Sequence, residues 1–299
     1  METGILLESG TNELEILEFR VGNNFYGINV AKVREILPYK EPTPIPNAHP
    51  CIEGIFMPRD EIITIVDLAK HLNMPADGSG RDMYIVTNFN KLNIGFHVHS
   101  VVGISRVSWA EISKPDATLN GNGTGIATGI IKLEGKLIVI LDFEKIISDI
   151  SPETGLKVSE IDLLGPRQRN TAPILIAEDS ALLGKLISES LSKAGYTNLT
   201  MTTNGQEAWD KLNEFKAEGV LDQKVRLIIT DIEMPQMDGH RLTKLVKDSA
   251  AFAHIPVVIF SSLVNDEMRK KGEALGADAQ LSKPEIGHLV EAIDGILWK

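Results

Sequence analysis

Acidic, hydroxyl and ammonium side chains follow four short apolar segments in the second half of the sequence. In chain order they are Glu178, Asp179, Asp231, Ser261 and Lys283. Three carboxylates in one place repel one another, and a hard divalent cation such as Mg²⁺ relieves the repulsion. A carboxylate beside such a cation can attack a phosphoryl donor, while an ammonium and a hydroxyl hold the transferred oxygens. If the five residues meet, their types suit phosphoryl transfer to Asp231.

The segments before these residues predict the sheet that positions them. Residues 174–177, 227–230, 257–260 and 279–282 are short and largely apolar, as buried parallel strands are. Stretches with helical periodicity lie between them, and strand and helix alternate about five times, which predicts a doubly wound α/β domain. Ligands of such domains bind beyond the carboxyl ends of the strands. We therefore expect the five polar residues to converge on one edge of the sheet.

Each of these residues taken alone has an ordinary structural explanation. An aspartate after a strand, such as Asp179 or Asp231, is more often a helix cap than a nucleophile, and a Lys-Pro pair usually lies in a loop. The combination favours a shared site, because four strand ends carry the required types in the required order. Pro284 restricts the backbone after Lys283 and favours a cis peptide bond in a tight turn.

Residues 172–299 resemble the receiver domains of two-component response regulators. The resemblance rests on the acidic pair, on the segment from Asp231 to Gly239 (Asp-Ile-Glu-Met-Pro-Gln-Met-Asp-Gly), on Ser261 and on Lys283 with its proline. It implies a flavodoxin-like fold and a phosphohistidine of a sensor kinase as donor. The implied roles are Asp231 as phosphoacceptor, Lys283 and Ser261 as phosphoryl ligands, and Glu178, Asp179, Asp231 and the backbone carbonyl of Glu233 at the Mg²⁺ site.

One position departs from the receiver pattern. Three residues before the lysine, the family often has a tyrosine or phenylalanine that rotates when a serine or threonine engages the phosphoryl group. This chain has Gln280 there. We therefore expect a readout face that works without an aromatic switch.

The bulk composition excludes several classes of function. A length of 299 residues favours two domains, and a net charge of −11 with a pI near 5.2 argues against a nucleic-acid partner. The first residues lack the positive start of a signal peptide, and no apolar run approaches the roughly 18 residues that span a bilayer. We expect a cytoplasmic protein without direct membrane insertion.

The first half predicts a different architecture, an all-β domain over residues 13–150. Its β-rich segments, separated by Gly, Asn and Pro, predict an antiparallel barrel or a pair of barrels. They are residues 14–21, 25–28, 52–57, 62–66, 83–87, 92–98, 101–107, 128–133 and 136–141. Residues 151–171 have the composition of a linker with one short amphipathic turn at 158–164. His97 and His99 alternate on one strand like a metal pair, but no third ligand is evident, so a solvated strand face is expected.

The first half also resembles the CheW-like coupling domains of bacterial chemotaxis, with two small β-barrels. The resemblance rests on three segments, which are residues 32–36 (Lys-Val-Arg-Glu-Ile), 49–54 (His-Pro-Cys-Ile-Glu-Gly) and Arg59 followed by residues 62–68. It implies that Val33, Glu35 and Arg59 contact a histidine kinase and receptor tips, although edge-strand residues without a partner are the alternative. Asp60 stands where the family usually has glycine after the arginine, so we expect a different loop.

Together, the two halves resemble the CheV-type coupling proteins of chemotaxis. The resemblance implies a non-enzymatic adaptor that couples methyl-accepting chemoreceptors to the histidine kinase CheA at receptor arrays and is modulated by phosphorylation of Asp231. No domain follows Lys299 in this sequence, so the expected output is the first half or its partners. Two alternatives stay open. The receiver could be a phosphate sink for the kinase, or the chain could be a small-molecule phosphatase, although Glu233 stands where such enzymes need a second aspartate.

Overall fold

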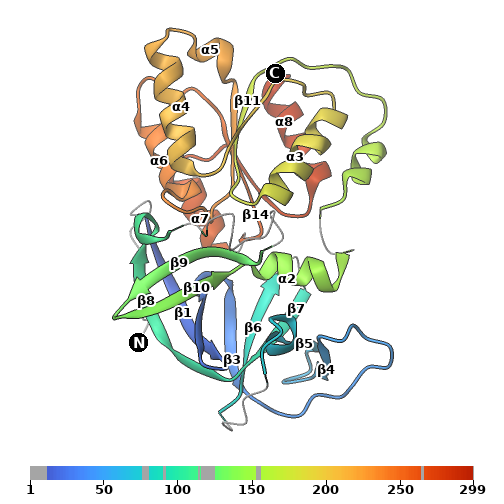
Figure 1. Ribbon diagram of the computed structural model, residues 1–299. Helices are drawn as coiled ribbons and strands as arrows, with labels where there is room; N and C mark the ends of the chain where they lie inside the picture. The colour runs from blue at the N-terminus through green and yellow to red at the C-terminus, as the bar shows by residue number, and fades with distance from the viewer. Residues whose placement is uncertain are drawn as a thin grey trace. The chain divides into compact units, whose positions relative to one another are not determined.

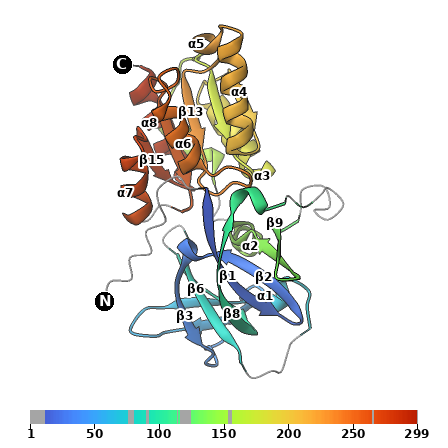
Figure 2. The same ribbon diagram turned by 90° about the vertical axis from the view of Figure 1, so that its left-hand side faces the viewer.

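The chain forms two compact units (Figures 1 and 2). One consists mainly of residues 14–154 and the other mainly of residues 155–299, and they are called the N-terminal and C-terminal units below. The computed structural model describes residues 12–75, 81–89, 92–113, 115, 125–152, 156–263 and 266–298. Within these ranges, no helix has the length and apolar composition needed to cross a membrane.

The C-terminal unit contains a five-stranded parallel sheet with the strand order β12-β11-β13-β14-β15. Its strands are β11 (Ile174–Ala177), β12 (Leu199–Thr202), β13 (Leu227–Thr230), β14 (Val257–Ser261) and β15 (Ala279–Ser282). Its helices are α3 (Ala181–Lys193), α4 (Gly205–Ala217), α5 (Leu221–Lys224), α6 (Gly239–Asp248), α7 (Asp266–Ala274) and α8 (Ile286–Leu297). The predicted doubly wound fold is confirmed.

Both faces of this sheet are buried. Successive residues of a strand point to opposite faces, so each strand contributes to two cores. Ile174 and Ile176 belong to a core with side chains of α3 and α8, whereas Leu175 and Ala177 belong to a second core with side chains of α4 and α6. Figure 1 shows these helix pairs on opposite sides of the sheet. The continuous apolar strands noted in the sequence are therefore explained by helices on both faces.

The segment before β11 packs on the C-terminal unit. The 3₁₀-helix η5 (Val158–Leu164) buries Ile161 in the core that α3 and α8 share, as the expected amphipathic turn at 158–164 would. Further along, Arg167 donates from Nη2 to both carboxylate oxygens of Asp294 at 2.6 Å, and its Nε donates to the Ala194 carbonyl at 2.8 Å. These contacts attach the segment to α3 and α8.

The N-terminal unit consists of two five-stranded sheets with the orders β8-β1-β2-β10-β9 and β3-β6-β7-β5-β4. The strands of the first sheet are β1 (Glu13–Val21), β2 (Asn24–Asn29), β8 (Ser100–Ser108), β9 (Ala127–Leu133) and β10 (Lys136–Leu141). Those of the second are β3 (Val33–Pro38), β4 (Ile52–Phe56), β5 (Ile63–Asp67), β6 (Met83–Phe89) and β7 (Leu92–Val98). Two short helices accompany them, α1 (Leu68–His71) and α2 (Phe143–Ile150).

Each sheet of the N-terminal unit has two buried faces, which agrees with a pair of barrels. A shared core joins the sheets through Phe19 of β1 and Phe96 of β7, with Phe143 of α2 between them. The second sheet also encloses a smaller core of its own, which includes Ile65 and Tyr84. Among the described elements of this unit, strand β3 and the helices α1 and α2 were not predicted from the sequence.

His99 is buried and His97 is partly buried, with 16% of its side chain exposed, so the expectation of a solvated strand face is wrong. His97 Nδ1 lies 2.9 Å from Glu53 Oε1 on β4, and its Nε2 lies 3.5 Å from Asp82 Oδ1. The rings of Tyr39 and Tyr84 contact it at centroid distances of 4.8 and 5.8 Å. Burial alone would lower the pKa of His97, but the hydrogen bond to Glu53 and the nearby carboxylate charges outweigh burial, and the pKa lies above its ordinary value.

This ion pair predicts a pH-dependent contribution to stability. A raised pKa in the folded state stabilises the fold below the unfolded pKa and ceases to do so as the pH rises through the folded pKa. We expect Glu53→Gln to lower both the pKa of His97 and the free energy of unfolding, the latter by about 1 to 2 kcal/mol at pH 6 and by less at pH 9. NMR titration of the His97 ring and urea unfolding, followed at resonances of the N-terminal unit, measure both quantities.

Glu61→Gln is the matched control, because Glu61 makes an ion pair with Arg34 but is about half exposed. Its effect on the free energy of unfolding should be smaller and should leave the His97 titration unchanged. A difference between wild type and Glu53→Gln that grows with pH would contradict the assignment of His97 as the charged partner.

Candidate functional site

The register of the parallel sheet brings the acidic residues together. Ala177 of β11 pairs with Thr230 of β13, so the residues that follow, Glu178 and Asp231, leave the sheet side by side. The chain turns to β12 on one side of β11 and to β13 on the other, which makes this edge a topological switch point. Lys283 follows β15 at the same edge.

The carboxylates of Glu178, Asp179 and Asp231 form one cluster, with ligand oxygens all within 4.8 Å of one another. Lys283 Nζ donates to Glu178 Oε2 at 2.8 Å and to Asp231 Oδ2 at 3.1 Å. Glu178, Asp231 and Lys283 are each at least 93% buried. Buried charges need partners, and one ammonium for three carboxylates leaves the cluster negative. The donor set therefore fits a hard divalent cation, which prefers carboxylate oxygens.

Both oxygens of Asp231 have a fixed orientation. Oδ2 accepts the hydrogen bond from Lys283, and Oδ1 accepts one from the Ile232 backbone N–H at 2.7 Å. A carboxylate held by these two hydrogen bonds presents one orientation to an incoming electrophile, which is what a nucleophile needs.

The predicted cis peptide bond between Lys283 and Pro284 is present.

Gly239, at the end of the loop that follows Asp231, contacts the backbone at the beginning of that loop. The Gly239 N–H donates to the Ile232 carbonyl at 2.9 Å, and a Cβ on Gly239 would lie 1.8 Å from the Asp231 carbonyl oxygen. Asp238 caps α6 by accepting from the Arg241 N–H at 2.7 Å. Gly239 belongs to the motif from Asp231 to Gly239, but its role was not predicted from the sequence. The Asp-Gly pair before a helical stretch was the available signal.

Two further predicted site residues, Ser261 at the end of β14 and Glu233 after β13, lie near the same edge of the sheet. Ser261 ends β14, is fully buried, and its Oγ accepts from the Leu263 N–H at 3.3 Å. The Lys283 N–H donates to the Ser261 carbonyl at 3.1 Å, which fixes their relative position. Glu233 is half-buried in the loop two residues after Asp231. Within the described ranges, the structure thus joins Glu178, Asp179, Asp231 and Lys283 directly.

Gln280 on β15 is turned toward α7. Its Nε2 donates to the Arg269 carbonyl at 2.7 Å, and a Cβ on Gly272 would lie 2.3 Å from its Oε1. The amide thus lies against the backbone of α7 at a point where only glycine leaves room. The position that often carries an aromatic ring in receivers is occupied here by a polar link between β15 and α7.

In the N-terminal unit, the structure brings Glu35 and Arg59 together. Arg59 Nη2 lies 3.4 Å from Glu35 Oε2, and the Arg59 side chain is 80% exposed. Val33 is partly buried against the shared core instead. Arg59 and Asp60 both have positive φ, 53° and 67°. This explains why glycine suits the position of Asp60, since aspartate is among the few other residues that tolerate this region.

The two segments that carry this ion pair also carry exposed apolar side chains. Arg34 of β3 also pairs with Glu61, so β3 is linked twice to the turn between β4 and β5. These two segments carry the exposed residues Ile36, Met57 and Ile62. We call Glu35, Arg59, Ile36, Met57 and Ile62 the coupling patch. Met57 and Ile62 lie in segments predicted from the sequence as strands, and their exposure was not predicted.

Comparisons with known proteins agree with this division. Residues 15–151 match the family model of the CheW-like domain, and residues 174–294 match that of the response regulator receiver domain. Among solved structures, the scaffolding protein CheW from Thermoanaerobacter tengcongensis is similar, with 26% identity and a TM-score of 0.40 over 43% of this chain and 83% of that one.

Two curated relatives match along almost the whole chain. Chemotaxis protein CheV3 of Helicobacter pylori is 34% identical, with 96% of each chain covered, and chemotaxis protein CheV2 of the same organism is 31% identical, with 94% of each covered. The chain has a CheW-like domain followed by a receiver domain, and it is similar to these relatives over almost its full length. The chain therefore belongs to the CheV family of chemotaxis proteins.

Proposed function

We propose that the C-terminal unit accepts a phosphoryl group on Asp231 from a phosphohistidine of the histidine kinase CheA. The observation that carries the proposal is the buried ammonium of Lys283, which contacts both Glu178 and Asp231 within one cluster of carboxylates. An isolated capping aspartate would need neither a buried lysine nor a second acidic residue. The arrangement fits a carboxylate that gains and loses a phosphoryl group.

In the transfer, a carboxylate oxygen of Asp231 forms the bond to phosphorus while the bond between phosphorus and the donor imidazole nitrogen breaks. The imidazole leaves with that electron pair and takes up a proton from solvent. Lys283 then pairs with a phosphoryl oxygen, because formation of the acyl phosphate removes the negative charge of the Asp231 carboxylate that Lys283 contacts. The Ser261 Oγ accepts its backbone hydrogen bond as an oxygen, so its own proton remains to be donated to a second phosphoryl oxygen.

The metal ligands that we assign are Glu178, Asp179, Asp231 and the backbone carbonyl of Glu233. Bound Mg²⁺ would neutralise charge on the phosphoryl oxygens. The chain's own contribution is the fixed orientation of the carboxylates, which the hydrogen bonds from Ile232 and Lys283 to Asp231 maintain.

The N-terminal unit serves as the docking module of the adaptor. The coupling patch combines exposed apolar side chains with the ion pair of Glu35 and Arg59, which is the usual composition of a binding patch with a polar rim. Its proposed partners are CheA and the methyl-accepting chemoreceptors, at whose arrays the adaptor would be located. Phosphorylation of Asp231 would modulate kinase activity by biasing two packings of the receiver.

Phosphoryl transfer is tested with the purified full-length chain, Mg²⁺ and labelled phospho-CheA. We expect acid-stable label on wild type and none on Asp231→Asn, and chelation of Mg²⁺ should lower the rate at least 100-fold. Asp222→Asn is the matched control, since Asp222 is an exposed aspartate of α5 that pairs with His254. Its labelling should equal wild type.

Equal labelling of Asp231→Asn and wild type would exclude Asp231 as the acceptor. Hydrolysis of a generic phosphomonoester that depends on Asp231 would favour a phosphatase instead. Label that is lost within seconds would favour the phosphate-sink role.

Gly239 is expected to be indispensable for the position of Asp231. A methyl group at Gly239 overlaps the Asp231 carbonyl, so Gly239→Ala should reduce the free energy of unfolding by about 1 to 3 kcal/mol and slow labelling at least 10-fold. Gly295→Ala in α8 is the control, because open space surrounds Gly295. It should stabilise the chain by about 0.5 to 1 kcal/mol and label normally. Normal labelling of Gly239→Ala would show that the loop positions Asp231 by other means.

Coupling is tested in arrays rebuilt from receptors, CheA and the full chain under phosphorylating conditions. A coupling free energy of about 1 to 3 kcal/mol corresponds to a change in kinase activity of roughly 5-fold or more. We expect kinase activity with wild type to differ by that factor from activity with Asp231→Asn, and Asp222→Asn to behave as wild type. Identical activity with all three proteins would disprove the coupling step, even if label transfer succeeds.

A further inference from the structure

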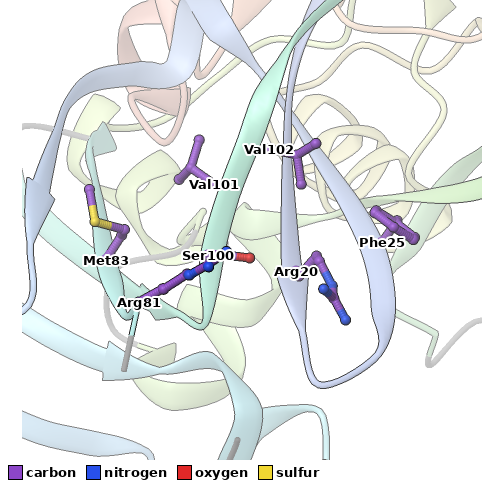
Figure 3. Close-up of a pocket in the computed structure, with 7 residues that line it drawn as sticks. All are labelled: Arg20, Phe25, Arg81, Met83, Ser100, Val101 and Val102. Atoms are coloured by element: carbon purple, nitrogen blue, oxygen red, sulfur yellow. The ribbon is translucent and has the colours of Figure 1, made fainter. Parts of the chain in front are cut away.

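A pocket with two arginines lies in the N-terminal unit, outside the coupling patch (Figure 3). Its volume is about 420 Å³, within the range typical of small-molecule sites. The lining residues come from the β1–β2 hairpin, from the start of β6 and from the start of β8. They are Arg20, Phe25, Arg81, Met83, Ser100, Val101 and Val102. Both sheets therefore contribute to the pocket.

The charge around this pocket is positive, although the chain as a whole is acidic. Among the residues that the structure describes, no residue lining the pocket is acidic. Within the described ranges, no ion pair joins Arg20, Arg81 or Lys136 to a carboxylate, whereas Arg34 and Arg106 each have one. Cations held near one another without counter-charge repel, so an anion bound among them would be stabilised.

The ring of Phe25 brings two of these cations close together. The Arg20 guanidinium lies 5.5 Å from the ring centroid and Lys136 Nζ lies 5.2 Å from it. Both distances are within the range of cation–π contacts. Phe25 thereby fixes the position of the cations while leaving their hydrogen-bond donors available.

Arg20 also has a buried donor without a partner. Its Nη2 donates to Asn23 Oδ1 at 3.3 Å, but its Nε is buried and has no hydrogen-bond partner. A buried donor without an acceptor is unfavourable and rare in native structures. Because this Nε is enclosed, an anion in the pocket would be held by the terminal nitrogens of the Arg20 guanidinium.

Backbone hydrogen bonds hold the two sides of the pocket in place. The His99 N–H donates to the Arg20 carbonyl at 2.9 Å, and the Gly22 N–H donates to His99 Nδ1 at 2.7 Å. Buried His99 thus connects the β1–β2 turn to the start of β8, where Ser100 lies. The side of the site formed by the β1–β2 hairpin and β8 is therefore preorganised, which reduces the entropy lost on binding.

We propose that this pocket binds a small organic dianion with a short apolar body, either a phosphate monoester or a dicarboxylate. Arg20 and Arg81 hold the anionic group, because guanidinium groups bind both anions through paired hydrogen bonds, and the Ser100 hydroxyl donates a further one. Met83, Val101 and Val102 contact the apolar body. A bound ligand would touch both sheets and so stabilise the N-terminal unit.

The probes are phenyl phosphate and benzylmalonate, which represent the two anion types, and benzyl alcohol as the neutral control. Each is titrated into the full chain by NMR with excess chelator, because phosphate then has no metal at the Asp231 cluster to bind. At least one dianion should bind saturably, shift the Ser100 and Val101 amide resonances and raise the Tm. The dianion that binds more tightly identifies the anion type, and benzyl alcohol should cause no shift.

Arg20→Gln and Arg81→Gln should each weaken this binding at least 10-fold, and Arg106→Gln, at an exposed ion pair, should not. Arg81 is exposed, so its replacement leaves the fold intact even if Arg20→Gln destabilises the hairpin. The proposal is overturned if neither dianion binds saturably, or if Arg81→Gln binds as tightly as wild type. Neither result depends on whether Asp231 is phosphorylated.

Discussion

The ammonium group of Lys283 lies between two buried carboxylates, and the C-terminal unit must hold these charges together. Its distances of 2.8 Å to Glu178 and 3.1 Å to Asp231 join the end of β15 to the ends of β11 and β13. A buried ammonium alone, or the two buried carboxylates alone, would strongly destabilise the fold. The strand order, the parallel register and the packing of helices on both faces are what hold these charges at contact distance.

The same contact bears on the proposed phosphorylation of Asp231, which would change the charge inside a buried cluster. In the unphosphorylated chain, Lys283 balances part of the carboxylate charge. An acyl phosphate transfers negative charge outward by a few ångströms, and a flexible lysine stem can follow it, because an ammonium acts as a point charge. The Asp231 N–H meanwhile donates to the Ala177 carbonyl at 3.0 Å, which ties the backbone of Asp231 to the end of β11.

Much of the fold and of the acidic site could be predicted because it depends on local patterns. The strands of the C-terminal unit are short apolar runs, and the polar residues that follow them must meet at one edge of a parallel sheet. The contacts that were not predicted join residues far apart in the sequence. Glu53 and His97 pair across strands, and His99 links two turns, so neither alternation nor spacing could show that His99 is buried and His97 partly buried. Strand β3 was missed because its residues were assigned only to a partner-binding motif.

The polar link at Gln280 determines how a change at Asp231 can reach α7. An aromatic ring at this position can rotate between a buried and an exposed state at modest cost, since either state leaves no hydrogen bond of the backbone broken. Gln280 instead donates to the Arg269 carbonyl at 2.7 Å, and its amide lies where a side chain at position 272 would be. Moving Gln280 away therefore breaks a hydrogen bond and opens space beside Gly272, which favours keeping β15 and α7 together. In this chain, a signal that passes through position 280 must move strand and helix as one body or break that hydrogen bond.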